Sequence, residues 1–346
     1  RVLTGDSASV ARSTCSRLGI PADSVITGSM LDAMEESEAL VRVGCGRVFA
    51  ELTPAQKAHI VSLIRLSGHT VGYIGDGVND VPALTSADVG IVVDSAAAES
   101  KKVADLVLLE RDLGVVAEGV SEGRTSFANA SKYIRIASSS NFGNICSVAA
   151  SSIFLPFLPA TAAQLLLLNL CYDATCLALS WDNVDDAEIA RPKAWSGKGL
   201  GSFMLHFGFA SSAFDIITFA ILLLGVCPAV CGGPFAALDA AGKAAFIAAF
   251  QAGWLLECAW TESLVLLVLR VRNVRDGGRP CRPLVIMVVA MLVASALLAL
   301  SPAAQLLGLA TLPVWYLGIV ALLSVLYLVV VSTIKRVYLS RSSSLF

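Results

Sequence analysis

The sequence predicts an α/β domain at the N-terminal end of the chain, followed by an all-α membrane domain of six helices. Charged residues make up 15% of the 346 residues and the mean hydropathy is +0.73. A soluble domain carries about 25% charged residues, so an ordinary soluble enzyme is excluded. The charges are also uneven, because residues 1–140 hold 30 of them and the longer remainder holds 22.

The first 140 residues alternate short apolar runs with helical patterns. Strands are expected at Val2–Thr4, Ser24–Ile26, Arg47–Ala50, Thr70–Ile74, Val89–Val92 and Leu106–Leu109. Helices are expected at Ser7–Leu18, Pro54–Leu66 and Ala96–Val103, the second starting with Thr53 as N-cap and Pro at the first helical position. This alternation predicts a parallel sheet whose ligands bind at the carboxyl ends of the strands.

Two of those strand ends carry unusual loops. One runs from Thr70–Ile74 into Gly75-Asp76-Gly77-Val78-Asn79-Asp80, where the glycines permit a tight turn. The i, i+4 spacing lets Asp76 and Asp80 face one point, and such oxygen ligands suit a Mg²⁺ ion that a substrate phosphate also holds. A simple turn is the alternative interpretation of this loop.

The other loop, together with one helix, adds groups for a phosphoryl ligand. Thr4 offers a hydroxyl and Gly5 a backbone amide, and Lys57 can supply a point charge. Three such features in this order make the simple-turn interpretation improbable.

Six apolar runs are each long enough to span a bilayer. They lie near Ile136–Phe157, Thr161–Ser180, Phe203–Val226, Ala244–Leu269, Leu284–Leu300 and Trp315–Ile334. Most basic residues of this part, Lys198 and Arg275 among them, fall in the loops after the second, fourth and sixth runs. The opposite loops hold only Lys243. The positive-inside rule therefore puts the N-terminal domain and the C-terminus on the cytoplasmic side.

Polar residues inside these runs are costly in hydrocarbon and mark candidate ion ligands. Asn141 and Asn144 share a face of the first run, and Asp173 lies at a similar depth in the second. An all-oxygen set with one formal charge suits Mg²⁺ better than copper or zinc. The alternative is that the asparagines only hold helices together.

Three further carboxylates, Asp215, Glu257 and Glu262, also lie in apolar runs. For these we favour interhelical hydrogen bonds or a place near the headgroups, with Glu257 the strongest functional candidate. The nine cysteines form no Cys-x-x-Cys pair and mostly lie in apolar runs, where thiols behave as small hydrophobes. A disulfide between Cys227 and Cys231 is the exception that the turn between them allows.

Several motifs resemble a known family. Leu3–Asp6, Thr53–Lys57 and Gly75–Asp80 resemble the phosphorylation-domain motifs of P-type ion-pumping ATPases. Within that family, the magnesium-transporting branch is the most similar, on the segments Ser138–Asn144, Phe154–Pro159, Asn169–Asp173, Asp182–Asp185, Ser211–Ile216 and Gln251–Trp254. The resemblance therefore covers essentially the whole chain.

The resemblance implies a haloacid-dehalogenase-like, Rossmann-like domain over residues 1–132 and a membrane domain over residues 133–346. It implies that Asp76 holds a catalytic Mg²⁺ with support from Asn79 and Asp80, of which Asp80 is a second candidate ligand. It further places Thr4, Gly5, Asp6 and Lys57 at an aspartyl-phosphate. The transported cation, expected to be Mg²⁺, would be bound by Asn141, Asn144 and Asp173.

The implied activity is ATP-driven import of Mg²⁺ by a multi-pass protein of the plasma membrane. ATP is the substrate, and the expected partners are membrane lipid, a divalent cation and the N-terminal portion of the same pump, with no nucleic acid. The Asp-Lys-Thr-Gly-Thr motif of the phosphorylated Asp is not found between Arg1 and Phe346. We therefore expect a C-terminal part of a pump that is inactive on its own. The alternatives are a pump for another cation such as Ca²⁺ and a truncated, non-catalytic membrane fragment.

Overall fold

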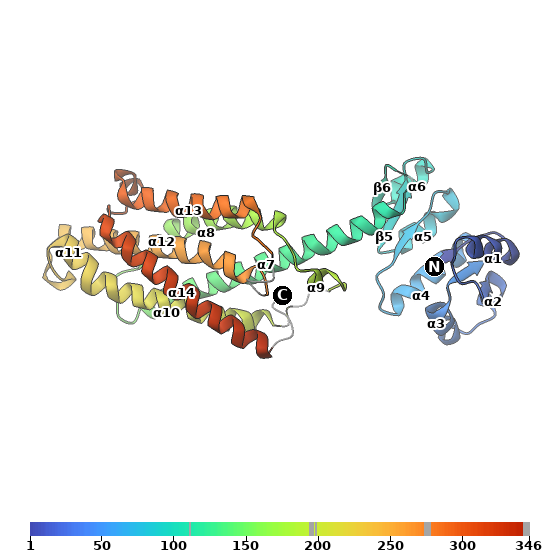
Figure 1. The fold of residues 1–346 in the computed structure, drawn as a ribbon, viewed down its shortest axis with the longest axis horizontal. Helices are drawn as coiled ribbons and strands as arrows, with labels where there is room; N and C mark the ends of the chain where they lie inside the picture. Colours follow the sequence, from blue (N-terminus) through green and yellow to red (C-terminus); the bar gives the residue numbers. More distant parts are fainter. Residues whose placement is uncertain (111, 194–196, 198, 273–277, 342–346) are drawn as a thin grey trace. The chain divides into compact units, whose positions relative to one another are not determined.

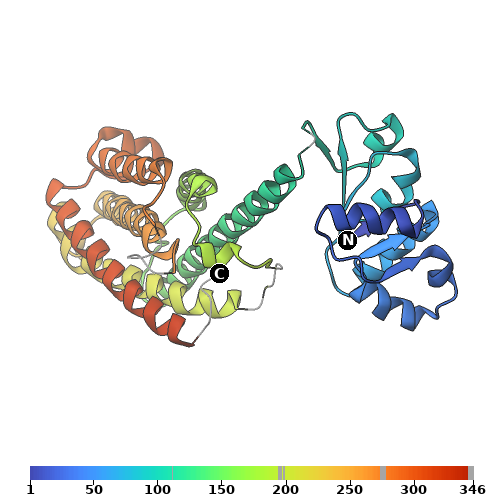
Figure 2. The same ribbon diagram turned by 45° about the vertical axis from the view of Figure 1, so that its right-hand side comes forward.

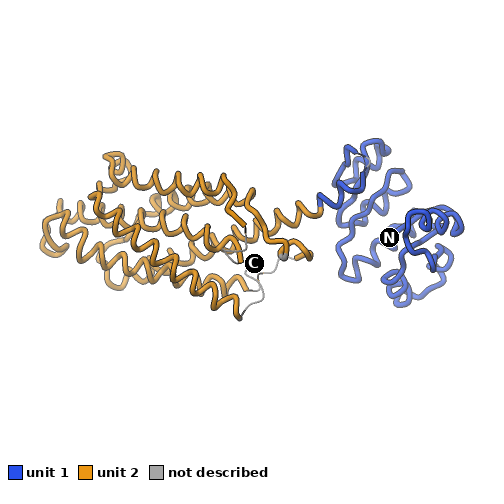
Figure 3. Tube along the Cα trace, viewed as in Figure 1, with its two compact units in different colours: residues 1–119 blue, residues 120–346 orange. Residues whose placement is uncertain are grey.

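The fold is described from a computed structural model. It describes residues 1–346 except 111, 194–196, 198, 273–277 and 342–346, so Lys198 and Arg275 lie outside the described residues. The chain forms two compact units, residues 1–119 and residues 120–346, coloured separately in Figure 3. The boundary expected between residues 132 and 133 falls in the helix that also contains the division between the two units, and it stays a prediction.

Unit 1 contains two three-stranded parallel sheets. The first has the order β1-β3-β2 and the second the order β4-β5-β6. Val48 pairs with both Val2 and Val25, and Tyr73 pairs with Gly90. All six predicted strands are confirmed, with bounds β1 Val2–Leu3, β2 Val25–Thr27, β3 Val48–Ala50, β4 Gly72–Ile74, β5 Val89–Val93 and β6 Leu106–Leu108.

The helices of unit 1 include the three predicted ones. These are α1 Ala8–Arg17, α4 Pro54–Leu66 and α6 Ala98–Val103. Thr53 caps α4 as predicted, and Gln56 completes a capping box by accepting from the Thr53 amide. The sequence reasoning did not predict the other helices, which are α2 Gly28–Asp32, α3 Glu36–Cys45, the 3₁₀ turn η1 Val78–Asp80 and α5 Val81–Ser86.

Three apolar clusters lie in unit 1, and two of them pack on α4. Phe49 of β3 packs with Ile60 and Leu63 of α4, while Val61 on another face of α4 packs with the buried side of the second sheet. Leu3 contacts both clusters. Helix α4 therefore lies between the two sheets, and this fixes the position of Lys57 on its first turns.

Unit 2 is a bundle of long helices (Figure 1). Five segments among the described residues are long and apolar enough to cross a membrane: Ala162–Trp181, Leu200–Ala237, Ala240–Leu269, Arg282–Leu300 and Val314–Ser340. The first segment consists of α8 Ala162–Cys176 and η2 Leu177–Trp181. The second contains α10 Leu200–Ile221, the π-helical η3 Leu222–Val226, α11 Cys227–Cys231 and η4 Phe235–Ala237. The last three correspond to α12 Ala240–Leu269, α13 Arg282–Leu300 and α14 Val314–Arg341. Between them lie the short α9 Asp186–Ile189 and η5 Pro302–Leu307.

The span predicted at Ile136–Phe157 is not confirmed. It falls in α7 Gly114–Ser151, a helix of 38 residues that ends before Phe157. Helix α7 is not among the described segments that are apolar enough to cross a membrane. The physical reason is the run Ser138–Asn141 together with Asn144, the same polar residues that suggested an ion path. Five of the six predicted spans therefore correspond to helical segments that are long and apolar enough to cross a membrane.

Helix α12 is the centre of the bundle. It contacts α8, α10, α13 and α14, and Figures 1 and 2 show it between α13 and α10. In the most apolar 18-residue segment of α12, 72% is buried inside the protein, whereas the corresponding share is 17–39% in the other four segments. Polar side chains on α12 are therefore shielded from water and lipid alike and need partners inside the bundle.

A buried cluster of charges lies at one end of this bundle. Asp182 accepts from Arg270 Nη1 at 2.8 and 3.0 Å and from Lys132 Nζ at 3.2 Å. Asn129 on α7 also donates to the Asp182 carbonyl oxygen at 3.0 Å. One carboxylate thus ties α7 to the end of α12 and to the segment after α8. Loss of one buried partner would leave an uncompensated charge.

Helices α7 and α10 cross at two glycines. A Cβ built on Gly208 would lie 2.7 Å from a ring carbon of Phe142 and 3.0 Å from the Ser139 carbonyl oxygen. A Cβ on Gly143 would lie 3.0 Å from the Gly208 carbonyl oxygen. Small residues let helix backbones approach closely, which is how helices associate in membranes.

The crossing predicts a specific sensitivity to added volume. Gly208→Ala is expected to lower the free energy of unfolding by about 1–3 kcal/mol, because the new methyl group overlaps Phe142 and the α7 backbone. Thermal unfolding of the full chain in detergent measures this. The matched control is Gly201→Ala in the same helix, where a Cβ meets nothing within 4 Å. Equal melting temperatures for the two variants would contradict the close crossing.

Candidate functional site

The loop after β4 brings together two of the predicted residues. Asp80 Oδ1 accepts from Lys57 Nζ at 2.8 Å and from the Tyr73 hydroxyl at 2.8 Å. The two side chains of the Lys57–Asp80 pair are 13% and 12% exposed. Helix α4 supplies the lysine and the middle residue of β4 is the tyrosine, so two elements converge on one carboxylate oxygen.

The surroundings of Asp80 keep it ionised. Burial acts to raise its pKa, but the hydrogen bonds from Lys57 and Tyr73 and the charge of Lys57 outweigh burial and lower it. The pKa of Tyr73 is raised, first by burial and then by its hydrogen bond to the Asp80 carboxylate. A neutral phenol and an ammonium group are therefore both held toward one carboxylate.

Gly75 is needed for this arrangement. A Cβ on Gly75 would lie 2.7 Å from Asp80 Cβ and 2.9 Å from Oδ2, so the carboxylate packs against the bare backbone. Helix α6 holds the same loop, because buried Ser100 donates to the Gly77 carbonyl oxygen at 2.8 Å. Sequence reasoning missed Tyr73 and Ser100. An alternating strand pattern places Tyr73 on the buried face, but nothing local marks Ser100.

Asp76 and Asn79 are exposed, in contrast to Asp80. Among the described residues the Asp76 carboxylate has no hydrogen-bond or ion-pair partner, while its carbonyl oxygen accepts from Ala97 N at 3.1 Å. An exposed carboxylate on a fixed backbone fits a Mg²⁺ ligand. Asp80, engaged by an ammonium group, fits the position of a residue that orients Lys57.

Thr4, Gly5 and Asp6 form a closed turn at the end of β1. The Thr4 hydroxyl donates to Asp6 Oδ2 at 3.0 Å and accepts from the Asp6 amide at 3.1 Å. The carbonyl oxygens of Thr4 and Asp6 accept from the Leu52 and Glu51 amides, which anchors this turn to the end of β3. Among the described residues no hydrogen bond joins this turn to Asp76.

The two loop glycines offer a matched test. Gly75→Ala is expected to displace Asp80 and to destabilise the segment from β4 to α5 by about 1–3 kcal/mol, since overpacking costs that much. Hydrogen–deuterium exchange of peptides from α4 and α5 in the full chain measures it. Gly77→Ala is the control, because its Cβ meets atoms only at 3.9 Å. Faster exchange in both variants alike would contradict the specific contact.

Asp80 also predicts a pH dependence. A carboxyl group with a lowered pKa stabilises the fold above its unfolded pKa, and this contribution is lost as the pH falls through the folded pKa. Asp80→Asn is therefore expected to cost about 1.5–3 kcal/mol near pH 7, the value of hydrogen bonds to a charged group. The deficit should shrink in acid. Exchange of α4 peptides between pH 3 and 7 tests this, with exposed Asp23→Asn as the control. A deficit that is constant with pH would contradict the charged acceptor.

The predicted membrane ligands have different partners. Asn144 is buried and donates to Glu262 Oε1 at 2.8 Å, whereas Asn141 is exposed in this chain. Asp173 accepts from the Tyr133 hydroxyl at 3.1 Å and lines a cavity of about 510 Å³ between α7 and α8. Glu262, which sequence reasoning ranked below the asparagines, is thus the direct neighbour of Asn144.

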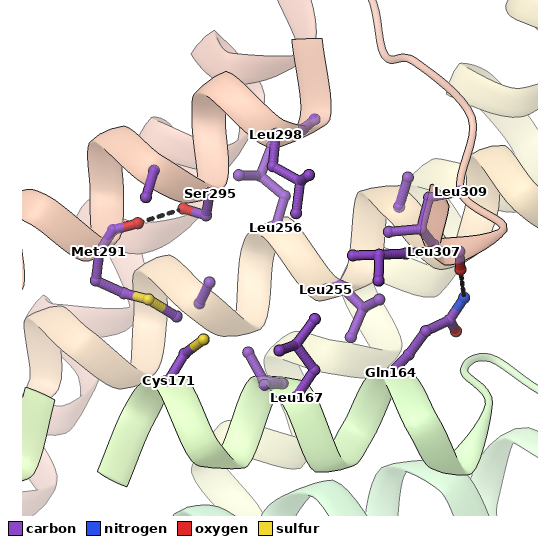
Figure 4. A pocket seen from close by; sticks show the side chains of 15 residues that line it. Gln164, Leu167, Cys171, Leu255, Leu256, Met291, Ser295, Leu298, Leu307 and Leu309 are labelled. Carbon is purple, nitrogen blue, oxygen red and sulfur yellow. Dashed lines mark hydrogen bonds between the residues drawn. The ribbon is translucent and has the colours of Figure 1, made fainter. Parts of the chain in front are cut away.

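A second cavity, of about 150 Å³, lies among α8, α12 and α13 (Figure 4). Its lining is apolar, apart from the side chains of Gln164 and Ser295, which donate to the Leu307 and Met291 carbonyl oxygens. With its polar atoms already engaged, this cavity does not suit a cation. Cys227 and Cys231 are free thiols one helical turn apart on α11, so the disulfide that the sequence allowed is not formed.

Family models match both units. Residues 157–337 match the C-terminal model of the cation transporting ATPases, and residues 57–120 match the haloacid dehalogenase-like hydrolases. The first match covers more than half of the chain. The chain belongs to the P-type cation-transporting ATPases. Unit 1 of this ATPase chain accordingly has a haloacid-dehalogenase-like fold, and unit 2 makes the chain an integral membrane protein.

Individual relatives agree with the family. The chain is 39% identical over its whole length to "Magnesium-transporting ATPase, P-type 1" of Salmonella typhimurium, of which it covers 37%. It is 40% identical over 91% of its length to the protein of that name in Escherichia coli K12, of which it covers 34%. An endoplasmic reticulum calcium ATPase of Aspergillus fumigatus is 34% identical over 55% of the chain. This ATPase chain thus spans about a third of the length of the two magnesium-transporting relatives, and the match covers 20% of the Aspergillus protein.

Proposed function

We propose that the chain works as part of an ATP-driven pump that imports Mg²⁺ across the plasma membrane through an aspartyl-phosphate cycle. The observation that carries this proposal is its similarity, over the full chain, to magnesium-transporting P-type ATPases. The engaged Lys57–Asp80 pair beside the exposed Asp76 supports the same function, since it supplies positive charge and a cation ligand at one strand end.

In unit 1 the residues divide the work of phosphoryl transfer. Asp76 would hold the catalytic Mg²⁺, which neutralises charge on the transferred phosphoryl group when bound. Lys57 brings a second positive charge, and Asp80 positions it. The Gly5 amide and the Thr4 hydroxyl are donors for the phosphoryl oxygens, with Asp6 orienting the hydroxyl and Asn79 supporting the loop.

In unit 2 the transported cation would be bound by Asn141, Asn144 and Asp173, with Glu262 adding a carboxylate next to Asn144. Helix α7 runs from unit 1 into unit 2 without a break, so it can carry motion of the phosphorylation domain to these residues. With α7 as a sixth span, the phosphorylation domain and the C-terminus lie on the cytoplasmic side.

A chimera tests the proposal. In this chimera the chain takes the place of the matching 37% of the Salmonella relative, and that relative supplies the remaining length of the pump. Expressed in a bacterium without its own Mg²⁺ transporters, the chimera is expected to restore growth at low Mg²⁺. The purified chimera should hydrolyse ATP faster when Mg²⁺ is available for transport, and the same measurement with Ca²⁺ identifies the transported cation. If Ca²⁺ alone raised the rate of ATP hydrolysis, the transported cation would be Ca²⁺ and not Mg²⁺.

Asp173→Asn in this chimera tests the proposed cation site. Loss of the formal charge is expected to reduce Mg²⁺ uptake by at least 10-fold, which is the effect of about 1.4 kcal/mol in binding. Asp23→Asn, an exposed residue of unit 1, is the control and should leave uptake unchanged. Unchanged uptake in Asp173→Asn would show that the cation does not use this carboxylate.

A further inference from the structure

A second group of acids lies deep in the bundle, apart from Asn144 and Asp173. Asp215 on α10 and Glu257 on α12 are 2% and 1% exposed, and Cys258 is 2% exposed. One ligand atom from each of these three residues lies within 4.8 Å of the other two. Among the described residues, none of the three forms an ion pair with a Lys or Arg side chain.

The groups that face this pair are acidic or neutral. Helix α12 also contributes Glu262, and α14 contributes Tyr316 and Tyr327, while α7 contributes the hydroxyl of Ser147. Two carboxylates a few ångströms apart cannot both ionise in a medium of low dielectric without a positive partner. At least one proton or one bound cation must therefore be present.

The donors around Asp215 decide which acid carries the negative charge. Trp254 Nε1 donates to Asp215 Oδ1 at 2.9 Å, and the indole N–H can only donate. The Ser147 hydroxyl lies within hydrogen-bond distance of Oδ2, and also of the Gly143 carbonyl oxygen and Ser212 Oγ. Cys258 Sγ lies 3.7 Å from Oδ1 as a weak donor. With Trp254 and Cys258 directed at Oδ1 and a hydroxyl beside Oδ2, Asp215 is the acid better suited to carry the negative charge.

Glu257 has the opposite surroundings. Its Oε2 atom is buried and has no hydrogen-bond partner among the described residues. An ionised carboxylate with a bare oxygen beside a second carboxylate would be costly in hydrocarbon. As a neutral acid, Glu257 has one O–H donor, and the Asp215 carboxylate is the acceptor within reach.

We propose that Asp215 and Glu257 form a buried proton-binding site, in which Glu257 holds one proton and donates it to the Asp215 carboxylate. The site carries a single negative charge. A divalent metal would require the same Asp215 oxygens that already accept from Trp254 and Ser147. The proton therefore ties α10 to α12, and Ser147 adds α7, the helix that runs in from unit 1.

Charge-neutral substitutions separate the two acids. Glu257→Gln keeps a neutral donor, so the purified full chain in detergent should melt within about 2 °C of the wild type. Asp215→Asn replaces the acceptor by an amide whose N–H group faces other donors, and it should lower the melting temperature by roughly 5 °C. Destabilisation of both variants to the same extent would overturn the assignment.

Infrared spectroscopy reads the proton directly, whether or not Asp215→Asn folds. The full chain near pH 7 should show the carbonyl stretch of a buried protonated carboxylic acid. Buried Glu262 also has an Oε2 atom without a hydrogen-bond partner among the described residues, so it can contribute to the same band. The comparison is therefore made in the Glu262→Gln background, where Glu257→Gln should remove the component. Persistence of the component in the chain that carries both substitutions would overturn the proposal.

Added metal ions test the competing interpretation. Mg²⁺ or Zn²⁺ should leave the difference in melting temperature between the wild type and Glu257→Gln unchanged. If either ion stabilised the wild type but not Glu257→Gln, the two acids would bind a metal and the proton assignment would be wrong.

Discussion

Both units of this chain are organised by carboxylates that are buried and must be satisfied without water. An unpaired charge in a low-dielectric interior is strongly unfavourable, so each such group fixes the elements around it. Asp80 accepts from Lys57 and Tyr73 and thereby positions α4 against the end of β4. Asp182 accepts from Lys132 and Arg270 and joins α7 to the end of α12. The position of α7 within unit 2 therefore depends on the buried charge of Asp182.

The bundle satisfies its acids in two different ways, and the difference indicates function. Asp182 is balanced by two cations, as expected for a structural contact. Asp215, Glu257 and Glu262 lie deeper and have no cation beside them among the described residues, so their balance comes from hydrogen-bond donors and from whatever proton or ion is bound. A proton held by Asp215 and Glu257 would leave Glu262 and Asn144 as the part of this region open to a transported cation.

Much of the local structure could be predicted because it is encoded locally. The strand from Val89 to Val93 is β-branched at every position except Gly90, and α4 begins at a Thr-Pro sequence that favours a helix N-terminus. The motif residues Lys57 and Asp80 were predicted as parts of one site, and the fold brings them to 2.8 Å. Helices α2 and α3 were missed because a short, polar, amphipathic helix resembles a loop when no core is there to identify its apolar face.

The sequence alone determined the division into a charged α/β unit and an apolar helical unit, the identity of the strands and five membrane spans, because apolar periodicity and run length record them directly. Only the tertiary structure decided the pairings between distant residues. Glu262 lies 118 positions from Asn144, and Trp254 lies 39 positions from Asp215, so no local pattern connects them. Such contacts follow from which helix faces meet, and at the α7–α10 crossing that choice depends on the glycines that let two backbones touch.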